Sequence, residues 1–411
     1  MRTPYRRRLV AGATLLVGAA WCAPGIAQSS SGWAYTDLGS IDGSFVGPVP
    51  LSESGLGIGQ AFSTNDSTGS FSYSGSSIAD LSALNGTSGG SFYVNAAGEV
   101  AGQSYASSGS STQAFYYANG KFNTIGSLGG TGTYVTGLNA SGEVVGYGNE
   151  AGNASTHAFA YSGGKITDLK TLGGTTSAAV AVNNSGEVIG NSTTSGDAAS
   201  HAFLYNAGTL TDLGTLGGSS SSATAINAAG MIVGNSTLSG NTAQHAYEYT
   251  SSGMMDLGTF GGTNSSAVAV NAAGEVIGNA TTAGNGATHA FLFANGKLTD
   301  LGTLGGTNSY AIGMDSFGDV IGMSNIAGST AQHSFLYSGG KMIDLSAIVP
   351  GISNFVASGI NNAMQIIGTG TTASGLLRGL IVSAVPETEG ATMALAGFAL
   401  LAWIARRQRR R

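Results

Sequence analysis

Cysteine is almost absent from the 411-residue chain, which has only Cys22. Because Cys22 precedes a predicted cleavage point after Ala27, the mature chain would contain no cysteine, and this excludes an intramolecular disulfide despite the expected export. Charged residues are also few, at 9 % of the sequence. Together with 68 glycines, this composition favours many short strands and turns over long solvated helices.

Basic residues are scarce between residues 28 and 384. Six lysines and arginines stand there against 19 aspartates and glutamates, so the net charge of this region is near −13. No basic stripe is available to neutralise phosphates, which excludes nucleic acid and anionic lipid as partners. Cations and neutral sugars are the ligands that fit such a chain.

Common catalytic motifs are missing as well. The sequence has no phosphate loop and no zinc motif. Six scattered carboxylates fall outside the repeated positions described below: Asp42, Glu53, Asp66, Glu150, Asp197 and Glu248. No two of them can be assigned as general acid and base from the sequence. We therefore predict a protein that is not an enzyme, and the alternative is a polysaccharide-processing enzyme.

The chain is built from a unit of 44 residues. The five histidines lie one period apart, and each is followed 11 residues later by the aspartate of an Asp-Leu pair. These positions are His157, His201, His245, His289 and His333, with Asp168, Asp212, Asp256, Asp300 and Asp344. A fixed period of this size is typical of a repeat array or a propeller.

Each unit contains four short apolar runs separated by turn residues, which is the pattern of a four-stranded antiparallel sheet. In one unit the first three runs fall at 178–182, 187–190 and 202–205. The fourth run carries the Asp-Leu pair and is expected to end in Leu-Gly-Gly. We expect Asn183 and its counterparts to cap the first turn, and a polar loop to cover 191–200.

The order of the runs indicates how the two ends of the repeat region meet. Each run occurs eight times, but the region starts with a fourth run at 33–38 and finishes with a third run at 380–382. This offset lets the N-terminal strand complete the last sheet and removes free sheet edges. We predict an all-β fold, a closed eight-bladed β-propeller whose N-terminal strand completes the last blade. An open solenoid or a pair of smaller propellers is the alternative.

The repeated motifs resemble those of a known family. His-Ala-Phe-Leu-Tyr from His201, followed by Asp-Leu-Gly-x-Leu-Gly-Gly and Asn-x-x-Gly-Glu-Val-Ile-Gly, is similar to the HAF repeat of extracellular bacterial proteins. The resemblance covers nearly all of residues 33–384. It implies export and a propeller-like repeat fold, and it supplies no catalytic residues.

The repeated polar residues have both metal-binding and structural interpretations. Histidine is a common metal ligand, but copies in different blades are too far apart for more than two to reach one ion. We therefore predict that each His and Asp form a structural pair in a buried polar network, as in WD-repeat blades. One acidic register follows the turn glycine: Glu99, Glu143, Glu187, Glu275 and Asp319. We expect it to form a solvated rim with no bound cofactor and at most weak Ca²⁺ association.

The N-terminal 27 residues have the pattern of a secretory signal peptide. Arginines at 6–8 precede an apolar stretch, and small residues precede Gln28. The mature chain is therefore expected to start near residue 28, after transport by the Sec machinery.

The C-terminal segment 385–411 resembles the PEP-CTERM sorting signal of exopolysaccharide-producing bacteria. It combines a Val-Pro-Glu motif, a short apolar transmembrane run at 391–405 and a basic end. The positions concerned are Val385, Pro386, Glu387, Arg406, Arg407, Arg409, Arg410 and Arg411. The resemblance implies an exosortase as partner and cleavage near Pro386, although Thr388 departs from the family motif. A simple tail anchor is the alternative.

The chain is thus predicted to have a signal peptide (1–27), a HAF-repeat propeller (28–384) and a sorting tail (385–411). The expected location is the cell surface or the extracellular space, with transient anchoring in the inner membrane by the tail alone. Loops rich in Ser, Thr, Asn and Gly suit hydrogen bonding to sugars but lack the aromatic platform of most sugar sites. We predict a non-enzymatic binding or structural role in an exopolysaccharide or biofilm matrix. A cation-dependent lectin-like module is a further alternative.

Overall fold

A computed structural model describes residues 26–28, 33–38, 45–46, 56–62, 68–74, 77–80, 89–105, 111–349 and 351–384. The sorting tail and the signal peptide up to residue 25 lie outside these residues, so the structure does not test those predictions. The expected cleavage point after Ala27 falls within the short strand β1 (Ile26–Gln28). Within the described ranges, no helix is long and apolar enough to cross a membrane.

The described chain consists almost entirely of antiparallel strands that follow one another in groups of four. The first two sheets contain β3 (Phe45–Val46), β4 (Leu56–Phe62), β5 (Thr68–Ser74) and β6 (Ser77–Asp80), then β7 (Gly89–Val94), β8 (Val100–Tyr105), β9 (Thr112–Ala118) and β10 (Lys121–Gly126). The next two contain β11 (Gly129–Leu138), β12 (Val144–Glu150), β13 (Thr156–Ser162) and β14 (Lys165–Lys170), then β15 (Gly173–Val182), β16 (Val188–Thr194), β17 (Ser200–Asn206) and β18 (Thr209–Asp212).

The same order continues through the rest of the repeat. The fifth and sixth sheets contain β19 (Gly217–Ile226), β20 (Ile232–Leu238), β21 (Gln244–Thr250) and β22 (Gly253–Asp256), then β23 (Gly261–Val270), β24 (Val276–Thr282), β25 (Thr288–Ala294) and β26 (Lys297–Asp300). The last two contain β27 (Gly305–Met314), β28 (Val320–Ile326), β29 (Gln332–Ser338) and β30 (Lys341–Asp344), then β31 (Ile352–Ile360), β32 (Gln365–Thr372), β33 (Leu377–Ala384) and β2 (Trp33–Asp37). Short helical turns occur at η2 (Ser195–Asp197), η3 (Ala283–Asn285) and α1 (Leu345–Ile348).

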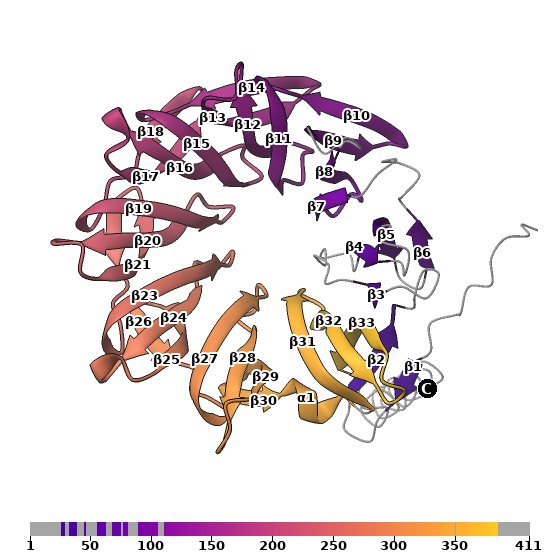
Figure 1. Cartoon of the computed structure of the whole chain (residues 1–411). Coiled ribbons are helices and arrows are strands. Elements are labelled where there is room, and N and C mark those ends of the chain that lie inside the picture. Colours follow the sequence, from indigo (N-terminus) through magenta and orange to yellow (C-terminus); the bar gives the residue numbers. More distant parts are fainter. Residues whose placement is uncertain are drawn as a thin grey trace, which may run out of the picture.

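The last sheet is assembled from both ends of the repeat region. β2 pairs antiparallel with β33, with Tyr35 opposite Val382, and β1 pairs with the other edge of β2. Figure 1 shows the sheets side by side around a centre, with the turn between the first and second strand of the third to eighth sheets directed inward. The predicted all-β, propeller-like class is confirmed, and β2 does join the sheet of the last three strands by pairing with β33. Closure of the whole ring stays a prediction.

Apolar cores lie between neighbouring sheets. Between the third and fourth sheets, for example, Val145 and Leu169 pack with Val188 and Phe203, and all four are buried. The rings of such third-strand aromatic residues lie against a glycine of the second strand, Gly190 in this unit. Because each core takes residues from two units, a sheet gains its buried surface only when its neighbour is present.

Two predicted boundaries were wrong. The paired glycines expected to end the fourth run begin the next sheet instead, since β15 starts at Gly173 and pairs there with Thr194. Half of the expected loop at 191–200 is strand, because 191–194 continue β16, and 191–193 pair with β17. A side chain at Gly174 would collide with the side chains of Thr193 and Asp197. The glycine is therefore required because the strands approach closely here, and the segment is not a free linker.

Candidate functional site

The structure brings each repeated histidine together with the aspartate 11 residues later. His201 Nδ1 lies 2.8 Å from Asp212 Oδ2, and the other four pairs have shortest Nδ1 to carboxylate distances of 2.7 to 3.0 Å. The two residues sit on the third and fourth strands of a sheet, which a tight turn joins, so local hairpin geometry is enough to bring them together.

These pairs are less buried than the WD-repeat comparison implies. The His201 side chain is 20 % exposed and that of Asp212 is 42 % exposed. The aspartate also accepts a hydrogen bond from the backbone N–H of Gly214, which fixes the turn that leaves the sheet. The pairs therefore lie in a partly exposed outer turn, and the buried network expected from the sequence is not observed there.

The repeated turn asparagines do more than cap their own turns. Asn183 Oδ1 accepts from the backbone N–H groups of Ser185 and Glu187, as predicted for an Asx cap. Its Nδ2 donates to the backbone oxygen of Asn227, 44 residues further along, at 3.1 Å. Asn95, Asn139, Asn227 and Asn271 donate to the following unit in the same way. A ladder of amide hydrogen bonds thus joins one turn to the next.

The acidic register lies beside this ladder. Glu187 Oε2 accepts from Asn183 Nδ2 at 2.6 Å, and Oε1 accepts from Asn206 Nδ2 at 3.1 Å. A Cβ placed at Gly230 would come within 3.0 Å of Glu187 Oε2, so each carboxylate faces the turn of the next unit. Burial raises the pKa of Glu143 in the equivalent position, against the hydrogen bond from Asn139. The four glutamates of the series are half-buried and hydrogen-bonded, in contrast to the solvated rim that the sequence predicts.

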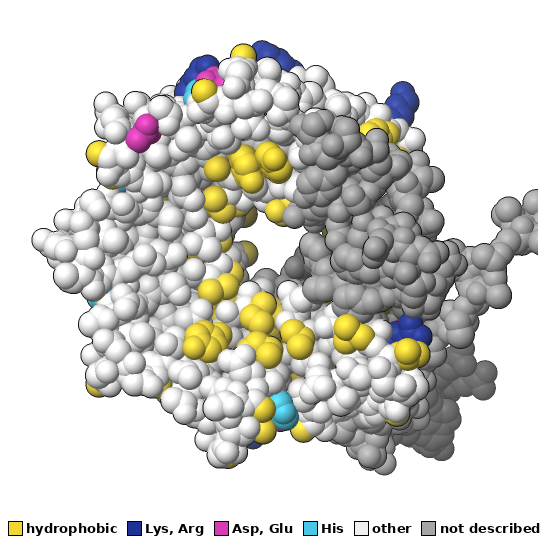
Figure 2. All heavy atoms as spheres, viewed as in Figure 1, with side chains coloured by type: hydrophobic (Ala, Val, Ile, Leu, Met, Phe, Trp, Pro, Cys, Tyr) yellow, Lys and Arg dark blue, Asp and Glu magenta, His cyan; other side chains and the backbone are white. Residues whose placement is uncertain are grey.

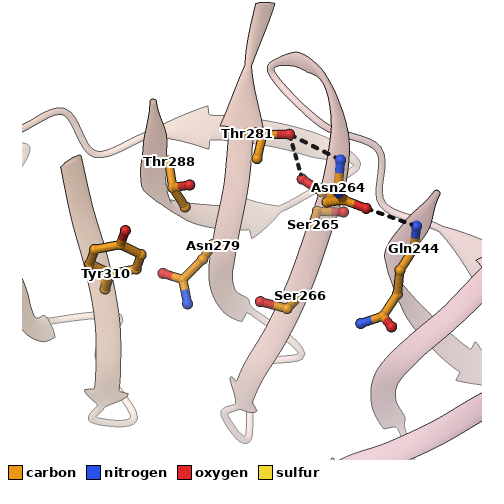
Figure 3. Close-up of a pocket in the computed structure, with 8 residues that line it drawn as sticks. All are labelled: Gln244, Asn264, Ser265, Ser266, Asn279, Thr281, Thr288 and Tyr310. Carbon is orange, nitrogen blue, oxygen red and sulfur yellow. Dashed lines mark hydrogen bonds between the residues drawn. The ribbon is translucent and has the colours of Figure 1, made fainter. Parts of the chain in front are cut away.

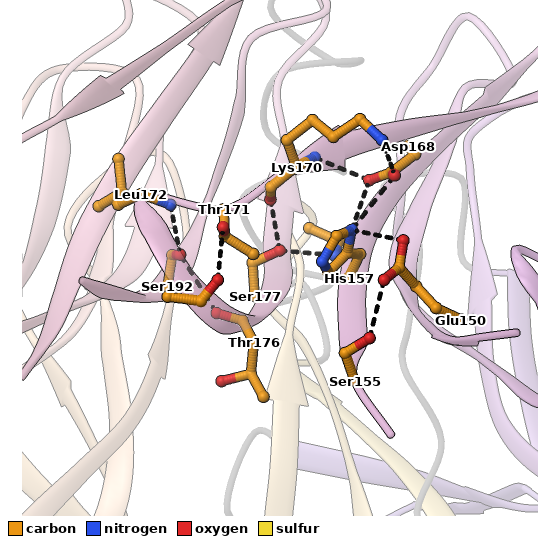
Figure 4. A network of polar contacts seen from close by, with 12 residues as sticks. Glu150, Ser155, His157, Asp168, Lys170, Thr171, Leu172, Thr176, Ser177 and Ser192 are labelled. Atoms are coloured by element: carbon orange, nitrogen blue, oxygen red, sulfur yellow. Dashed lines mark hydrogen bonds and ion pairs between the residues drawn. The ribbon is translucent and has the colours of Figure 1, made fainter. Parts of the chain in front are cut away.

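One His–Asp pair differs from the other four because a second carboxylate reaches it. Glu150 Oε1 lies 3.2 Å from His157 Nδ1, and Asp168 Oδ1 lies 3.0 Å from the same nitrogen (Figure 4). Ser155 Oγ donates to Glu150 Oε2 at 2.7 Å. The corresponding positions of the next four units are Thr194, Leu238, Thr282 and Ile326. Glu150 is therefore a departure from the repeat that converges on a repeated pair.

A second departure converges on the same pair. Lys170 Nζ contacts Asp168 Oδ2, and the Lys170 backbone N–H donates to Asp168 Oδ1 at 2.8 Å (Figure 4). Lys170 has a φ of 70°, a conformation that disfavours a side chain. The three following units have glycine here, at Gly214, Gly258 and Gly302, with φ values of 73° to 80°. A lysine thus occupies a backbone position suited to glycine, and its ammonium meets the carboxylate.

The charges around Asp168 change its protonation equilibrium. Burial acts to raise the pKa of Asp168, but hydrogen bonds from Lys170 and His157 outweigh it and hold the pKa below the ordinary value of 3.8. The carboxylate is therefore ionised at neutral pH. Glu150, Asp168 and Lys170 together place two anionic groups and one cationic group around a single imidazole.

A different site lies between the fifth, sixth and seventh sheets. It is a cavity of about 400 Å³, called here the polar groove, and its lining is Gln244, Asn264, Ser265, Ser266, Asn279, Thr281, Thr288 and Tyr310. Ser266, Asn279 and Tyr310 lie in a row across β23, β24 and β27 (Figure 3). Asn279 Oδ1 accepts from the backbone N–H of Ala311 at 2.8 Å, which holds the amide between two sheets.

The polar groove supplies the aromatic side chain that the polar loops lack. Tyr310 is 36 % exposed and occupies the position of Ser222 and Ser266 in the preceding units. No charged residue lines the groove. This site was not predicted from the sequence because Tyr310 lies on a strand of a neighbouring unit, although the three preceding units have a small residue at its position, Ala178, Ser222 and Ser266.

The visible surface matches this lack of charge. Figure 2 shows few charged side chains on the described part of this face, and hydrophobic side chains gathered around the central opening. A second cavity of about 220 Å³, between the second and third sheets, is also uncharged and is lined by Ser111, Thr112, Gln113, Thr124, Gly126, Ser127, Gly130, Thr131 and Thr133. Uncharged polar cavities are therefore found at two places in the repeat.

No protein-family model matches the sequence, and no curated protein matches it. Among solved structures, the chain is similar to the β-propeller domain of the Trilobed protease from Pyrococcus furiosus, with a TM-score of 0.49, 9 % identity, and coverage of 74 % of this chain and 97 % of the other. It is also similar to an acylaminoacyl peptidase from Pyrococcus horikoshii, with a TM-score of 0.49, 8 % identity, and coverage of 80 % and 58 %.

A third structure, dipeptidyl peptidase 4 from Porphyromonas gingivalis, matches with a TM-score of 0.44 and 9 % identity, over 80 % of this chain and 64 % of the other. The chain thus spans about three fifths of the length of the two full peptidases. At such identities nothing about activity carries over, and the fold class given above rests on the strand pairing of this chain.

Proposed function

We propose that the chain is an exported, non-enzymatic repeat protein that binds neutral polysaccharide through the polar groove. The observation that supports this is the lining itself, which combines amide and hydroxyl groups with the exposed ring of Tyr310 and has no charge. Sugar hydroxyls hydrogen-bond to amides and hydroxyls, and the C–H face of a sugar ring packs on an aromatic side chain. Uronic acids and phosphorylated glycans would find no cationic partner there.

The composition of the groove also favours binding over hydrolysis. Glycoside hydrolysis needs two carboxyl groups about 5 to 9.5 Å apart on either side of the scissile bond. No carboxylate lines the polar groove. Glu150 and Asp168 do converge, but both contact the same nitrogen of His157, which leaves no space for a sugar between them.

Binding is tested by applying the purified full chain to an array of neutral and acidic glycans, with and without Ca²⁺. Binding of neutral glycans is expected, and Tyr310→Ser should weaken it by several-fold to about tenfold, since one aromatic contact contributes about 1 kcal/mol. Phe317→Ser is the matched control, because Phe317 is 74 % exposed and does not line the groove. An array without any bound glycan, or equal binding by Tyr310→Ser, would contradict the proposal.

Export and surface attachment are a separate part of the proposal, which the signal peptide and the tail motif support. Val385, Pro386 and Glu387 would be the residues that an exosortase recognises before the chain is released or attached at the surface. Replacement of Pro386 and Glu387 by alanine should give an unprocessed product that fractionates with the inner membrane. Normal processing of this variant would show that the motif is not a sorting signal.

A further inference from the structure

The cluster of Glu150, His157 and Asp168 has the geometry of a ligand set. Nδ1 of His157 lies 3.2 Å from Glu150 Oε1 and 3.0 Å from Asp168 Oδ1, and the three ligand atoms all lie within 4.8 Å of one another. The ligand atoms of a tetrahedral zinc ion, with bonds of about 2.0 to 2.2 Å, lie about 3.3 to 3.5 Å apart. The two distances from Nδ1 are thus within a few tenths of an ångström of those around a zinc ion, and the third, between the two carboxylates, is at most 4.8 Å.

The two carboxylates also offer His157 Nδ1 more hydrogen-bond acceptors than its single N–H group can satisfy. An imidazole nitrogen carries at most one proton, yet two carboxylates lie within hydrogen-bond distance of His157 Nδ1. Asp168 has further donors in Lys170, and Glu150 Oε2 has Ser155, whereas Glu150 Oε1 faces Nδ1. In the neighbouring pair, His201 Nδ1 meets only the carboxylate of Asp212. The added carboxylate is a group for which a cation is the natural partner.

We propose that Glu150, His157 and Asp168 bind a divalent transition-metal ion of the zinc type, with water completing the coordination. One neutral imidazole and two carboxylates are ligands that zinc accepts, and a three-residue set with an open position is a common zinc arrangement. The His157 side chain is 13 % exposed and that of Glu150 is 34 % exposed, so the site is shielded on one side and reachable from solvent on the other.

Lys170 is the competing cation of this site. Its ammonium contacts Asp168 Oδ2, but its side chain is 70 % exposed and is free to swing into solvent when a metal ion binds. Metal binding then replaces the single positive charge of the ammonium with the two positive charges of the ion beside the two carboxylates.

The test is a titration of the purified full chain with Zn²⁺, followed by calorimetry and by nitrogen-15 NMR of the histidine rings. One ion should bind per chain, and the Nδ1 resonance of a single histidine, His157, should shift. Glu150→Thr, which restores the residue found in two other units, should weaken binding by more than the 10- to 100-fold typical of an outer-shell partner. Lys170→Gly should strengthen binding by about tenfold, because a nearby like charge is removed.

The repeat provides its own control. His201→Ala removes an equivalent pair that lacks the third carboxylate, and it should leave Zn²⁺ affinity and the His157 shift unchanged. Circular dichroism shows whether each variant keeps the fold. The proposal is overturned if the wild-type chain binds no Zn²⁺, if Glu150→Thr binds it equally well, or if all five histidines shift together. Binding of Ca²⁺ without Zn²⁺ would also overturn it.

Discussion

The Nδ2 group of Asn139 donates a hydrogen bond of 2.9 Å to the backbone oxygen of Asn183, one full repeat further along the chain. The same relationship continues from Asn183 to Asn227, so one side chain both closes its own turn and joins it to the next sheet. This contact is a structural counterpart of the 44-residue period, since it exists only when two units stand side by side.

Asn183→Ala should lower the free energy of unfolding by about 2 kcal/mol, because it removes a turn cap and one of the two donors to the buried carbonyl of Asn227. Chemical denaturation measures the effect. Ser185→Ala, in the same turn but exposed, should change the stability by less than about 0.5 kcal/mol. Equal stabilities for the two variants would show that the amide ladder contributes nothing.

Gly278→Ala should destabilise the chain by about 3 kcal/mol, since the added methyl group would collide with the backbone oxygen of Ser266 and the ring of Phe291. Gly286→Ala lies in the same unit but meets nothing within 4 Å and has a φ of −76°. It should be neutral or stabilise by up to about 1 kcal/mol. Thermal unfolding of the two variants compares them, and a similar loss in both would point to a general cost of replacing glycine.

Tyr247→Phe should stabilise the chain by about 1 to 2 kcal/mol. The Tyr247 hydroxyl is buried with no hydrogen-bond partner among the described residues, and burial alone raises the pKa of this phenol. Other units have phenylalanine at the position of Tyr247: Phe159, Phe203, Phe291 and Phe335. Tyr249→Phe, at a half-buried position, serves as the control, and a loss of stability in Tyr247→Phe would reveal a partner for the hydroxyl.

Asp168 should make folding pH-dependent in the acid range. Its folded pKa lies below 3.8, so its contribution to stability is fully present above that value and is lost as the pH falls through the lower folded pKa. The difference in unfolding free energy between the wild type and Asp168→Asn should therefore shrink on acidification. Urea denaturation between about pH 2 and pH 7 measures it. In a Lys170→Met background, the pH range over which the contribution of Asp168 is lost should become narrower. An unchanged range would show that Lys170 does not lower the pKa of Asp168.

Completion of the last sheet by β2 is testable with a cysteine pair. Ala34 and Ser383 are opposite each other in the pairing of β2 with β33, and cross-strand neighbours are close enough for a disulfide. Ala34→Cys with Ser383→Cys, in a Cys22→Ser background, should cross-link on oxidation and migrate faster in a non-reducing gel. Ala34→Cys with Ser185→Cys should not. Two free thiols in both variants would contradict the pairing.

The sequence by itself determined the features that depend on spacing along the chain. The 44-residue period, the offset that places β2 beside β33, and the pairing of His201 with Asp212 all follow from counting, because hairpin neighbours must meet wherever their strands pair. Residues that break the register carried further information. Glu150 stood out in the sequence as a carboxylate outside the repeated positions. Lys170 stood out only when it was compared with the equivalent residues of the following units, which are glycines.

Only the tertiary structure decided what lies between units. Three features depend on how neighbouring strands pack and on the path of the loop between β12 and β13. They are the hydrogen bond from Asn139 to Asn183, the row of Ser266, Asn279 and Tyr310, and the contact of Glu150 with His157. Periodicity states which residues are equivalent, but it does not give the distance between equivalent residues. That distance is set by the packing of side chains between sheets, and it is why a column of asparagines becomes a hydrogen-bonded ladder.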